Sequence, residues 1–107
     1  MGYADFVQAT PEPQLAFLLN FILPGLGCKA AAYYGDGGIN WKCWGIGMVM
    51  NLIWCFSMFS AAWWYSWTFW LPIIPACFWF IGLIIWVWGI FHSYMIWKVS
   101  KDKYYST

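Results

Sequence analysis

The sequence has few charges and no arginine. Its 107 residues include five lysines and four acidic residues, so that 8% of the chain is charged, whereas 64% is hydrophobic and 25% aromatic. Soluble domains contain about 25% charged residues, because polar side chains must cover the surface that a small domain leaves exposed. The composition therefore excludes an ordinary soluble domain, a disordered chain and a nucleic-acid-binding protein. It predicts a small integral membrane protein.

Charge is absent altogether from one long stretch. Residues 43–97 contain no Asp, Glu, Lys or Arg, a length of roughly 55 residues, where roughly 20 are enough to cross a hydrocarbon core as a helix. Pro72 and Pro75 interrupt this stretch, and proline suits the start of a helix better than its middle. We therefore expect an all-α membrane protein with two transmembrane helices, about 43–65 and 73–97, in an antiparallel hairpin.

A shorter apolar segment precedes the expected hairpin. Thr10-Pro11-Glu12-Pro13 has the composition of a helix start, with Thr10 as the N-cap, and Pro24-Gly25-Leu26-Gly27 ends the apolar run. The expected helix, about 11–23, is roughly 20 Å long, which is short for a full span. We expect it to be re-entrant or interfacial. The alternative is a third, kinked span that continues through residues 30–34.

These boundaries predict a single integral membrane domain. Residues 35–42 form a polar turn in which Asn40 is a plausible N-cap for the next helix. The domain then divides into an N-terminal segment 1–10, a first apolar segment 11–34, the turn 35–42, the helical hairpin 43–97 and a basic tail 98–107.

The tryptophans gather at the expected ends of the two spans. Indole rings favour the headgroup level of a bilayer, because they are apolar with a single hydrogen-bond donor. Trp44 and Trp64 would be about 30 Å apart on a helix, which matches the thickness of the hydrocarbon core. The interfacial anchors predicted in this way are Trp41, Trp44, Trp63, Trp64, Trp67, Trp70 and Trp97.

All five lysines belong to segments that would share one membrane face, namely the 29–42 region and the tail. By the positive-inside rule that face is cytoplasmic, or matrix-like in an organelle. Lys98, Lys101 and Lys103 would set this topology, and they would also attract anionic lipid. The N-terminus lies on the same face if the first segment is re-entrant, and on the opposite face if it is a third span.

Small and polar residues recur at helical spacing along both expected spans. Close van der Waals contact and side-chain hydrogen bonds, which small residues permit, hold helices together in lipid. These faces either join the two helices of this chain or bind another chain, and two helices alone would not use both faces. We therefore expect a homo-oligomer or other membrane subunits as partners. The predicted packing residues are Gly47, Asn51, Ser57, Ala61, Gly82, Gly89 and Ser93.

Groups that carry chemistry are scarce. The four cysteines form no Cys-x-x-Cys pair, so that neither a zinc site nor a redox motif is predicted, although Cys28 and Cys43 are candidates for palmitoylation. His92 is the one histidine, and an interfacial, hydrogen-bonded role is favoured over a proton relay, because no acid or lysine shares its depth. We expect no enzyme activity, no metal and no cofactor apart from bound lipid.

One combination of motifs resembles the TM-two domain family of small membrane proteins. Pro24-Gly25-Leu26-Gly27, then Tyr34-Gly35, and a long apolar stretch that ends in Trp88-Gly89-Ile90-Phe91-His92-Ser93-Tyr94 are similar to its turn, its Tyr-Leu-Gly element and its final helix. The resemblance covers about residues 15–97 and implies a small helical membrane domain. Where that family has an acidic residue in the last helix, this chain has His92.

The sequence thus favours a small polytopic membrane protein with a structural role. It would pack laterally into a homo-oligomeric or filamentous assembly and shape the bilayer. One alternative is an accessory subunit of a larger membrane complex. Another is an uncharged oligomeric pore around Asn51 and Ser57.

Overall fold

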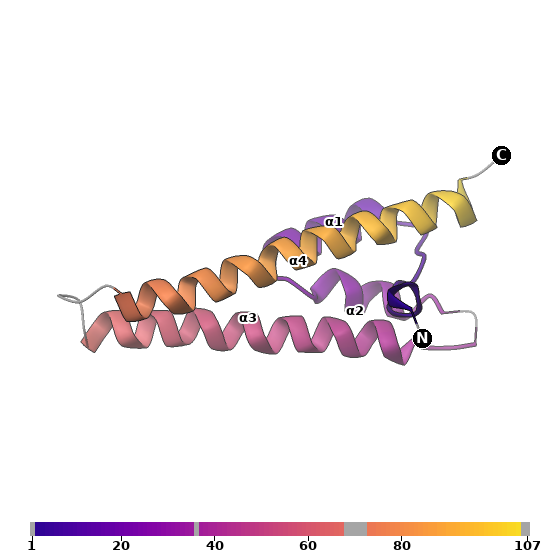
Figure 1. The fold of residues 1–107 in the computed structure, drawn as a ribbon. Helices are drawn as coiled ribbons and strands as arrows, with labels where there is room; N and C mark the ends of the chain where they lie inside the picture. The colour runs from indigo at the N-terminus through magenta and orange to yellow at the C-terminus, as the bar shows by residue number, and fades with distance from the viewer. Residues whose placement is uncertain (1, 36, 68–72, 106–107) are drawn as a thin grey trace.

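The computed structural model describes residues 2–35, 37–67 and 73–105, and these form helices without strands (Figure 1). The elements in chain order are a short 3₁₀ helix η1 (Tyr3–Phe6), α1 (Pro13–Ile22), α2 (Leu26–Ala32), α3 (Trp41–Trp67) and α4 (Ile73–Tyr104). The all-helical fold expected from the sequence is confirmed.

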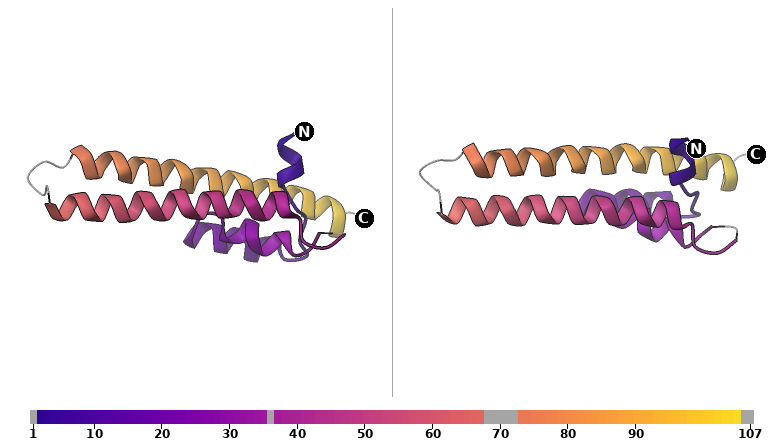
Figure 2. Two further views of the ribbon diagram at one scale, coloured as in Figure 1. Left: turned by 90° about the horizontal axis from the view of Figure 1, so that it is seen from below. Right: turned by 60° about the horizontal axis from the view of Figure 1, so that its bottom comes forward.

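The two long helices lie side by side and run in opposite directions (Figures 1 and 2). Both are long and apolar enough to cross a membrane, with a mean hydropathy of 1.5 for the best window of α3 and 2.2 for that of α4. Only 22% of each window is buried within the chain. A core helix of a soluble protein would be mostly covered by its neighbours, so these two helices instead present apolar surface outwards.

α4 continues past the predicted end of the apolar span. The sequence predicts residues 73–97, and the helix starts at Ile73 but runs on to Tyr104. The added turns contain Lys98, Lys101 and Lys103, and lysine is a good helix former. Charge ends an apolar span, but it does not end a helix.

The first apolar segment folds back on itself. α1 ends at Ile22, Gly25 takes a left-handed conformation with φ of 96°, and α2 starts at Leu26. The side-chain N–H of Gln8, ahead of α1, donates to the carbonyl of Tyr34, after α2, at 3.2 Å. The beginning and the end of the segment therefore meet, so that in this fold α1 and α2 reverse direction and do not continue as a third, kinked helix.

α1 begins two residues later than expected. The hydroxyl of Thr10 accepts a hydrogen bond from the N–H of Glu12 at 3.3 Å and does not cap the helix. Glu12, with φ of −124° and ψ of 67°, is not helical. A residue that precedes proline is pushed out of the helical region, so Pro13, and not Pro11, occupies the first position of the helix.

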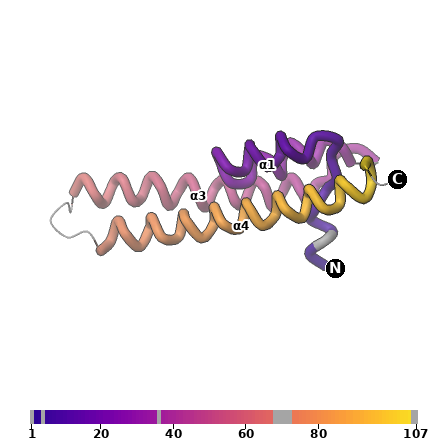
Figure 3. The backbone as a smooth tube through the Cα atoms, turned by 90° about the horizontal axis from the view of Figure 1, so that it is seen from above, coloured from indigo at the N-terminus to yellow at the C-terminus, as the bar shows by residue number. Residues whose placement is uncertain are grey.

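The extra helices lie along one half of the long pair. α1 packs against α4 and α2 against α3, near the end of the molecule where both termini of the described chain are found (Figures 2 and 3). The fully buried core residues belong to this half, among them Cys28, Ala32, Cys43, Met50 and Ile96. The other half consists of α3 and α4 alone.

Candidate functional site

The polar centre of the molecule is the side chain of Asn20, near the end of α1. It is completely buried, and all of its hydrogen-bonding capacity is directed at other segments. Its carbonyl oxygen accepts from the backbone N–H groups of Gly25 (3.0 Å) and Gly27 (2.8 Å). Those donors lie at the start of α2, where a helix leaves N–H groups without intrahelical partners. Asn20 therefore caps α2 from the neighbouring helix.

The amide nitrogen of Asn20 joins this turn to α4. It donates to the hydroxyl of Ser93 at 2.6 Å and lies 3.4 Å from the carbonyl oxygen of Gly89. The hydroxyl of Ser93 in turn donates to the same carbonyl at 2.9 Å. Because a buried polar group without a partner is costly, this set of bonds holds α1, α2 and α4 in one arrangement.

Glycines allow the backbones to come close at the same place. A Cβ atom added to Gly89 would lie 3.2 Å from the Cβ of Pro24, and one added to Gly47 would lie 2.6 Å from the carbonyl oxygen of Gly25. A side chain at Gly27 would overlap the carbonyl of Ala16 in α1. The turn between α1 and α2 therefore fits directly between the small-residue faces of α3 and α4.

The N-terminal segment is attached to α4 by a second polar cluster. The indole N–H of Trp88 donates to the phenol oxygen of Tyr3 at 3.0 Å, and the same oxygen is hydrogen-bonded to Nδ1 of His92 at 2.6 Å. Burial raises the pKa of the Tyr3 phenol above its usual 10.0, so the hydroxyl stays protonated at neutral pH. His92, itself fully buried, is thus a hydrogen-bonded partner of η1.

Further polar contacts close the end of the molecule where the termini lie. The backbone N–H of Thr10 donates to the buried hydroxyl of Ser100 at 2.9 Å. The side-chain amide of Asn40 donates to Gln8 at 3.0 Å, while its oxygen accepts from the backbone N–H of Cys43 at 3.2 Å. The last bond is the capping contact that the sequence predicts for Asn40.

The predicted packing residues lie mainly inside this single chain. Gly47, Ser57, Gly82, Gly89 and Ser93 are buried against its own helices. Asn51 is buried as well, and its amide makes no hydrogen bond with any described residue. Ala61 is partly exposed. Gly47, Gly89 and Ser93 contact the α1–α2 hairpin, which the sequence analysis did not anticipate. Gly82 instead faces Ser57 and Met58 of α3, as expected if these faces join the two long helices of this chain.

Most of the predicted tryptophan anchors point outwards. Trp41, Trp63, Trp64, Trp67 and Trp97 are exposed, and Trp44 is half-buried against the core. The ring of Trp41 meets that of Trp44 edge-on with centroids 5.8 Å apart. Trp70 lies outside the described residues.

The three tail lysines are exposed at the end of α4. The Lys101 ammonium lies 5.2 Å from the centre of the Trp97 ring, and that of Lys103 lies 5.4 Å from the centre of the Tyr104 ring. These distances are typical of cation–π contacts.

The four cysteines are free thiols. Cys28 and Cys43 are buried, Cys55 is partly exposed and Cys77 is exposed. Within residues 2–35, 37–67 and 73–105, no three His, Cys, Asp or Glu side chains gather as a metal site would require. Since Cys28 and Cys43 are covered, neither thiol is presented to an acyl donor in this fold.

Asn20 and Tyr3 are the residues that sequence reasoning missed. Asn20 interrupts the apolar run that precedes Pro24, and a lone polar residue in such a run signals a specific partner. Tyr3 carries no comparable signal, because its partners Trp88 and His92 lie more than 80 residues further along the chain.

Comparison of the chain with protein-family models, with curated proteins and with solved structures gives no match. The resemblance to the TM-two domain family therefore stays a prediction.

Proposed function

We propose that the chain is a structural protein of a membrane that widens one leaflet. In this proposal α3 and α4 span the bilayer as an antiparallel hairpin, and α1 and α2 enter only the leaflet next to the termini. The observation that carries the proposal is the position of α1 and α2 along one half of the long pair (Figure 3). One leaflet would then contain four helices, whereas the other leaflet would contain two.

The depth of the α1–α2 turn agrees with half a bilayer. Pro24 contacts Gly89, and the indole N–H of Trp86 donates to the carbonyl of Phe21 at 2.8 Å. Gly89 and Trp86 precede Trp97 by about 12 and about 17 Å of helix, respectively. If Trp97 lies at the headgroup level, the turn lies near the middle of a hydrocarbon core about 30 Å thick.

The outer surface supports insertion into lipid. Large apolar side chains are exposed along the whole length of both long helices, for example Leu52, Phe59, Phe80 and Val87. A soluble monomer rarely exposes such a continuous apolar surface. In a bilayer the same surface contacts acyl chains, so that no apolar side chain is exposed to water there.

The lysines support one orientation. Lys29, Lys42 and the three tail lysines occur in or beside the half that holds α1 and α2. By the positive-inside rule this half faces the cytoplasm or a matrix, together with both termini. The wider half would then favour a membrane that is convex on that side, since inserted volume expands the leaflet that contains it.

Lateral assembly remains part of the proposal, but through a different surface. Because the buried small residues contact either the α1–α2 hairpin or the other long helix, contacts between copies would use the exposed aromatic faces of α3 and α4. A role as an accessory subunit would use the same faces. A pore around Asn51 and Ser57 would require these buried side chains to become accessible, so nothing in this arrangement favours it.

The experiment tests whether the orientation of the inserted protein depends on the curvature of the vesicle membrane. The purified protein is reconstituted into small and large unilamellar vesicles of one lipid composition, and the fraction of C-terminal tails that an external protease cuts is measured. We expect this fraction to be higher in the small vesicles, because their outer leaflet accommodates the wider half. A fraction independent of the vesicle radius contradicts the proposal.

Two variants that keep the charges and both long helices test whether the α1–α2 hairpin causes the curvature dependence. Gly27→Leu places a side chain where the carbonyl of Ala16 lies and should separate α1 from α2, whereas Gly45→Leu adds a side chain at a glycine with open space around it. The curvature dependence should be reduced in the first variant and kept in the second.

A further inference from the structure

A groove runs along the line where α1 meets α4. Its upper part, a cavity of about 340 Å³, is lined by Pro13, Gln14, Trp97, Lys101 and Tyr105. Its lower part, of about 390 Å³, shares Pro13, Gln14 and Trp97 and continues towards the middle of the molecule. The shared residues make these two hollows one continuous groove.

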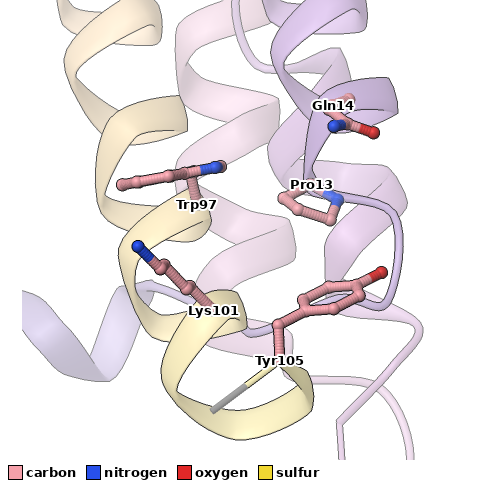
Figure 4. Close-up of a pocket in the computed structure, with 5 residues that line it drawn as sticks. All are labelled: Pro13, Gln14, Trp97, Lys101 and Tyr105. Atoms are coloured by element: carbon pink, nitrogen blue, oxygen red, sulfur yellow. The ribbon is translucent and has the colours of Figure 1, made fainter. Parts of the chain in front are cut away.

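The upper part is polar and carries positive charge. Trp97 and Lys101 lie on α4 and Tyr105 directly follows it, whereas Pro13 and Gln14 lie at the start of α1, on the side towards which Tyr105 reaches (Figure 4). Neither the Gln14 amide nor the Lys101 ammonium has a hydrogen bond or ion pair with another described residue, and Lys101 only lies over the Trp97 ring at 5.2 Å. Donor groups at this end are therefore available to a ligand.

The phenol of Tyr105 closes the groove at its outer end. It donates a hydrogen bond to the carbonyl of Pro11 and so ties the tail to the start of α1. This contact fixes the distance between the two walls at the polar end.

The lower part is apolar. Phe17 from α1 and Ile90 and Tyr94 from α4 form its walls. Tyr94 stacks on Trp97 with ring centroids 6.2 Å apart, which extends the wall towards the polar end. Ser93, which also lines this part, is already bonded to Asn20 and Gly89, so this part offers a ligand mainly contact with carbon.

We propose that this groove binds one anionic phospholipid, with its headgroup at Gln14 and Lys101 and an acyl chain along Phe17, Ile90 and Tyr94. From Ile90 to Lys101 is about 17 Å of helix, close to half the thickness of a hydrocarbon core. The tail from Lys98 to Lys103 carries three lysines and one aspartate, which favours a negative headgroup. The inference rests on the proposed function, because the groove must lie in a leaflet for a lipid to enter it.

The experiment measures lipid binding by native mass spectrometry of the protein in detergent micelles, titrated with phosphatidylglycerol or with phosphatidylcholine. We expect one phosphatidylglycerol to be retained per chain in preference to phosphatidylcholine. Lys101→Gln should weaken retention of phosphatidylglycerol about fivefold, since a lysine at a membrane surface contributes about 1 kcal/mol of attraction to anionic lipid. Phe17→Ala should weaken retention through the acyl chain.

Matched variants separate the groove from general attraction. Lys98→Gln removes the same charge one turn away, and Leu18→Ala shortens an exposed side chain of α1 outside the groove. Leu18→Ala should retain phosphatidylglycerol as the unchanged protein does, and Lys98→Gln should lose less retention than Lys101→Gln, because Lys98 does not line the groove. Equal retention of the two lipids, equal loss in Lys98→Gln and Lys101→Gln, or no loss in Lys101→Gln would overturn the inference.

A separate measurement tests whether the chain is inserted in the membrane, on which the lipid site depends. Reconstituted protein is extracted with alkaline carbonate, which releases peripheral proteins and leaves integral ones in the vesicles. If the chain is released, the proposed function and the lipid site fail together. If the chain stays and Lys101→Gln binds lipid normally, only the lipid site fails.

Discussion

Asn20 combines two roles that are usually divided between residues. Its oxygen caps a helix that starts six residues later, and its nitrogen bonds to Ser93 of α4, which is 73 residues further along the chain. Asn51 on α3 is also buried but has no hydrogen bond with a described residue. The two amides therefore make opposite contributions to the stability of the folded chain.

The first prediction compares the same substitution at these two positions. Asn20→Leu leaves the N–H groups of Gly25 and Gly27 and the Ser93 hydroxyl without their partner, and should lower the free energy of unfolding by about 1–3 kcal/mol. Asn51→Leu removes a desolvated amide that has no hydrogen bond and should leave stability unchanged or increase it. Thermal unfolding in detergent micelles, followed by circular dichroism, measures both. Loss of stability in Asn51→Leu would mean that its amide has a partner beyond the described residues.

At the scale of elements, the α1–α2 hairpin is held by backbone contact more than by side-chain interdigitation. Gly25, Gly47 and Gly89 bring the turn against both long helices, and Gly27 brings α2 against α1. The helices are short, of 10 and 7 residues, and isolated helices of this length are marginal. Their stability therefore depends on the close fit to α3 and α4.

The second prediction uses two glycines with opposite surroundings. Gly27→Ala places a methyl group against the Ala16 carbonyl and should destabilise the hairpin by about 1–3 kcal/mol. Gly45→Ala adds a methyl group where no atom lies within 4 Å, so the better helix propensity of alanine should give a gain of about 0.5–1 kcal/mol. Hydrogen exchange of the α1 and α2 amides, with thermal unfolding, distinguishes the two. Equal protection of these amides in both variants would contradict the close fit.

At the scale of the whole molecule, the chain is long and narrow, with extents of 57 × 23 × 22 Å. Both ends of the described chain, the end of α2 and the start of α3 lie at one end of it (Figure 1). An arrangement with a third span would have placed the N-terminus at the opposite end.

The third prediction concerns this shared end. Short epitope tags added at the N-terminus and at the C-terminus should be accessible from the same side of a cell membrane or of a sealed vesicle. Selective permeabilisation followed by antibody binding measures each tag in the same preparation. Tags on opposite sides would contradict both the folded-back first segment and the one-leaflet insertion.

Much of this architecture could be predicted from local sequence. The length of the charge-free stretch and the two prolines at 72 and 75 place both long helices within a few residues, because apolar run length and proline geometry act locally. The Asn40 cap and the shortness of α1 follow from equally local signals. The end of α4 was placed too early, since apolarity marks the limits of a span and lysine-rich turns continue as helix.

Only the tertiary structure decided how these helices pack against one another. Pro24 and Gly25 stop a helix in any context, but the reversal depends on where the freed N–H groups find an acceptor, and that acceptor is Asn20. Likewise Gly47 and Gly89 indicate that another segment packs closely there, but they do not indicate which segment, because a glycine permits close contact with any surface of matching shape. The sequence by itself determined which segments are apolar enough for a membrane. Contacts between residues up to 94 apart determined that the first segment lies against one half of the long helices.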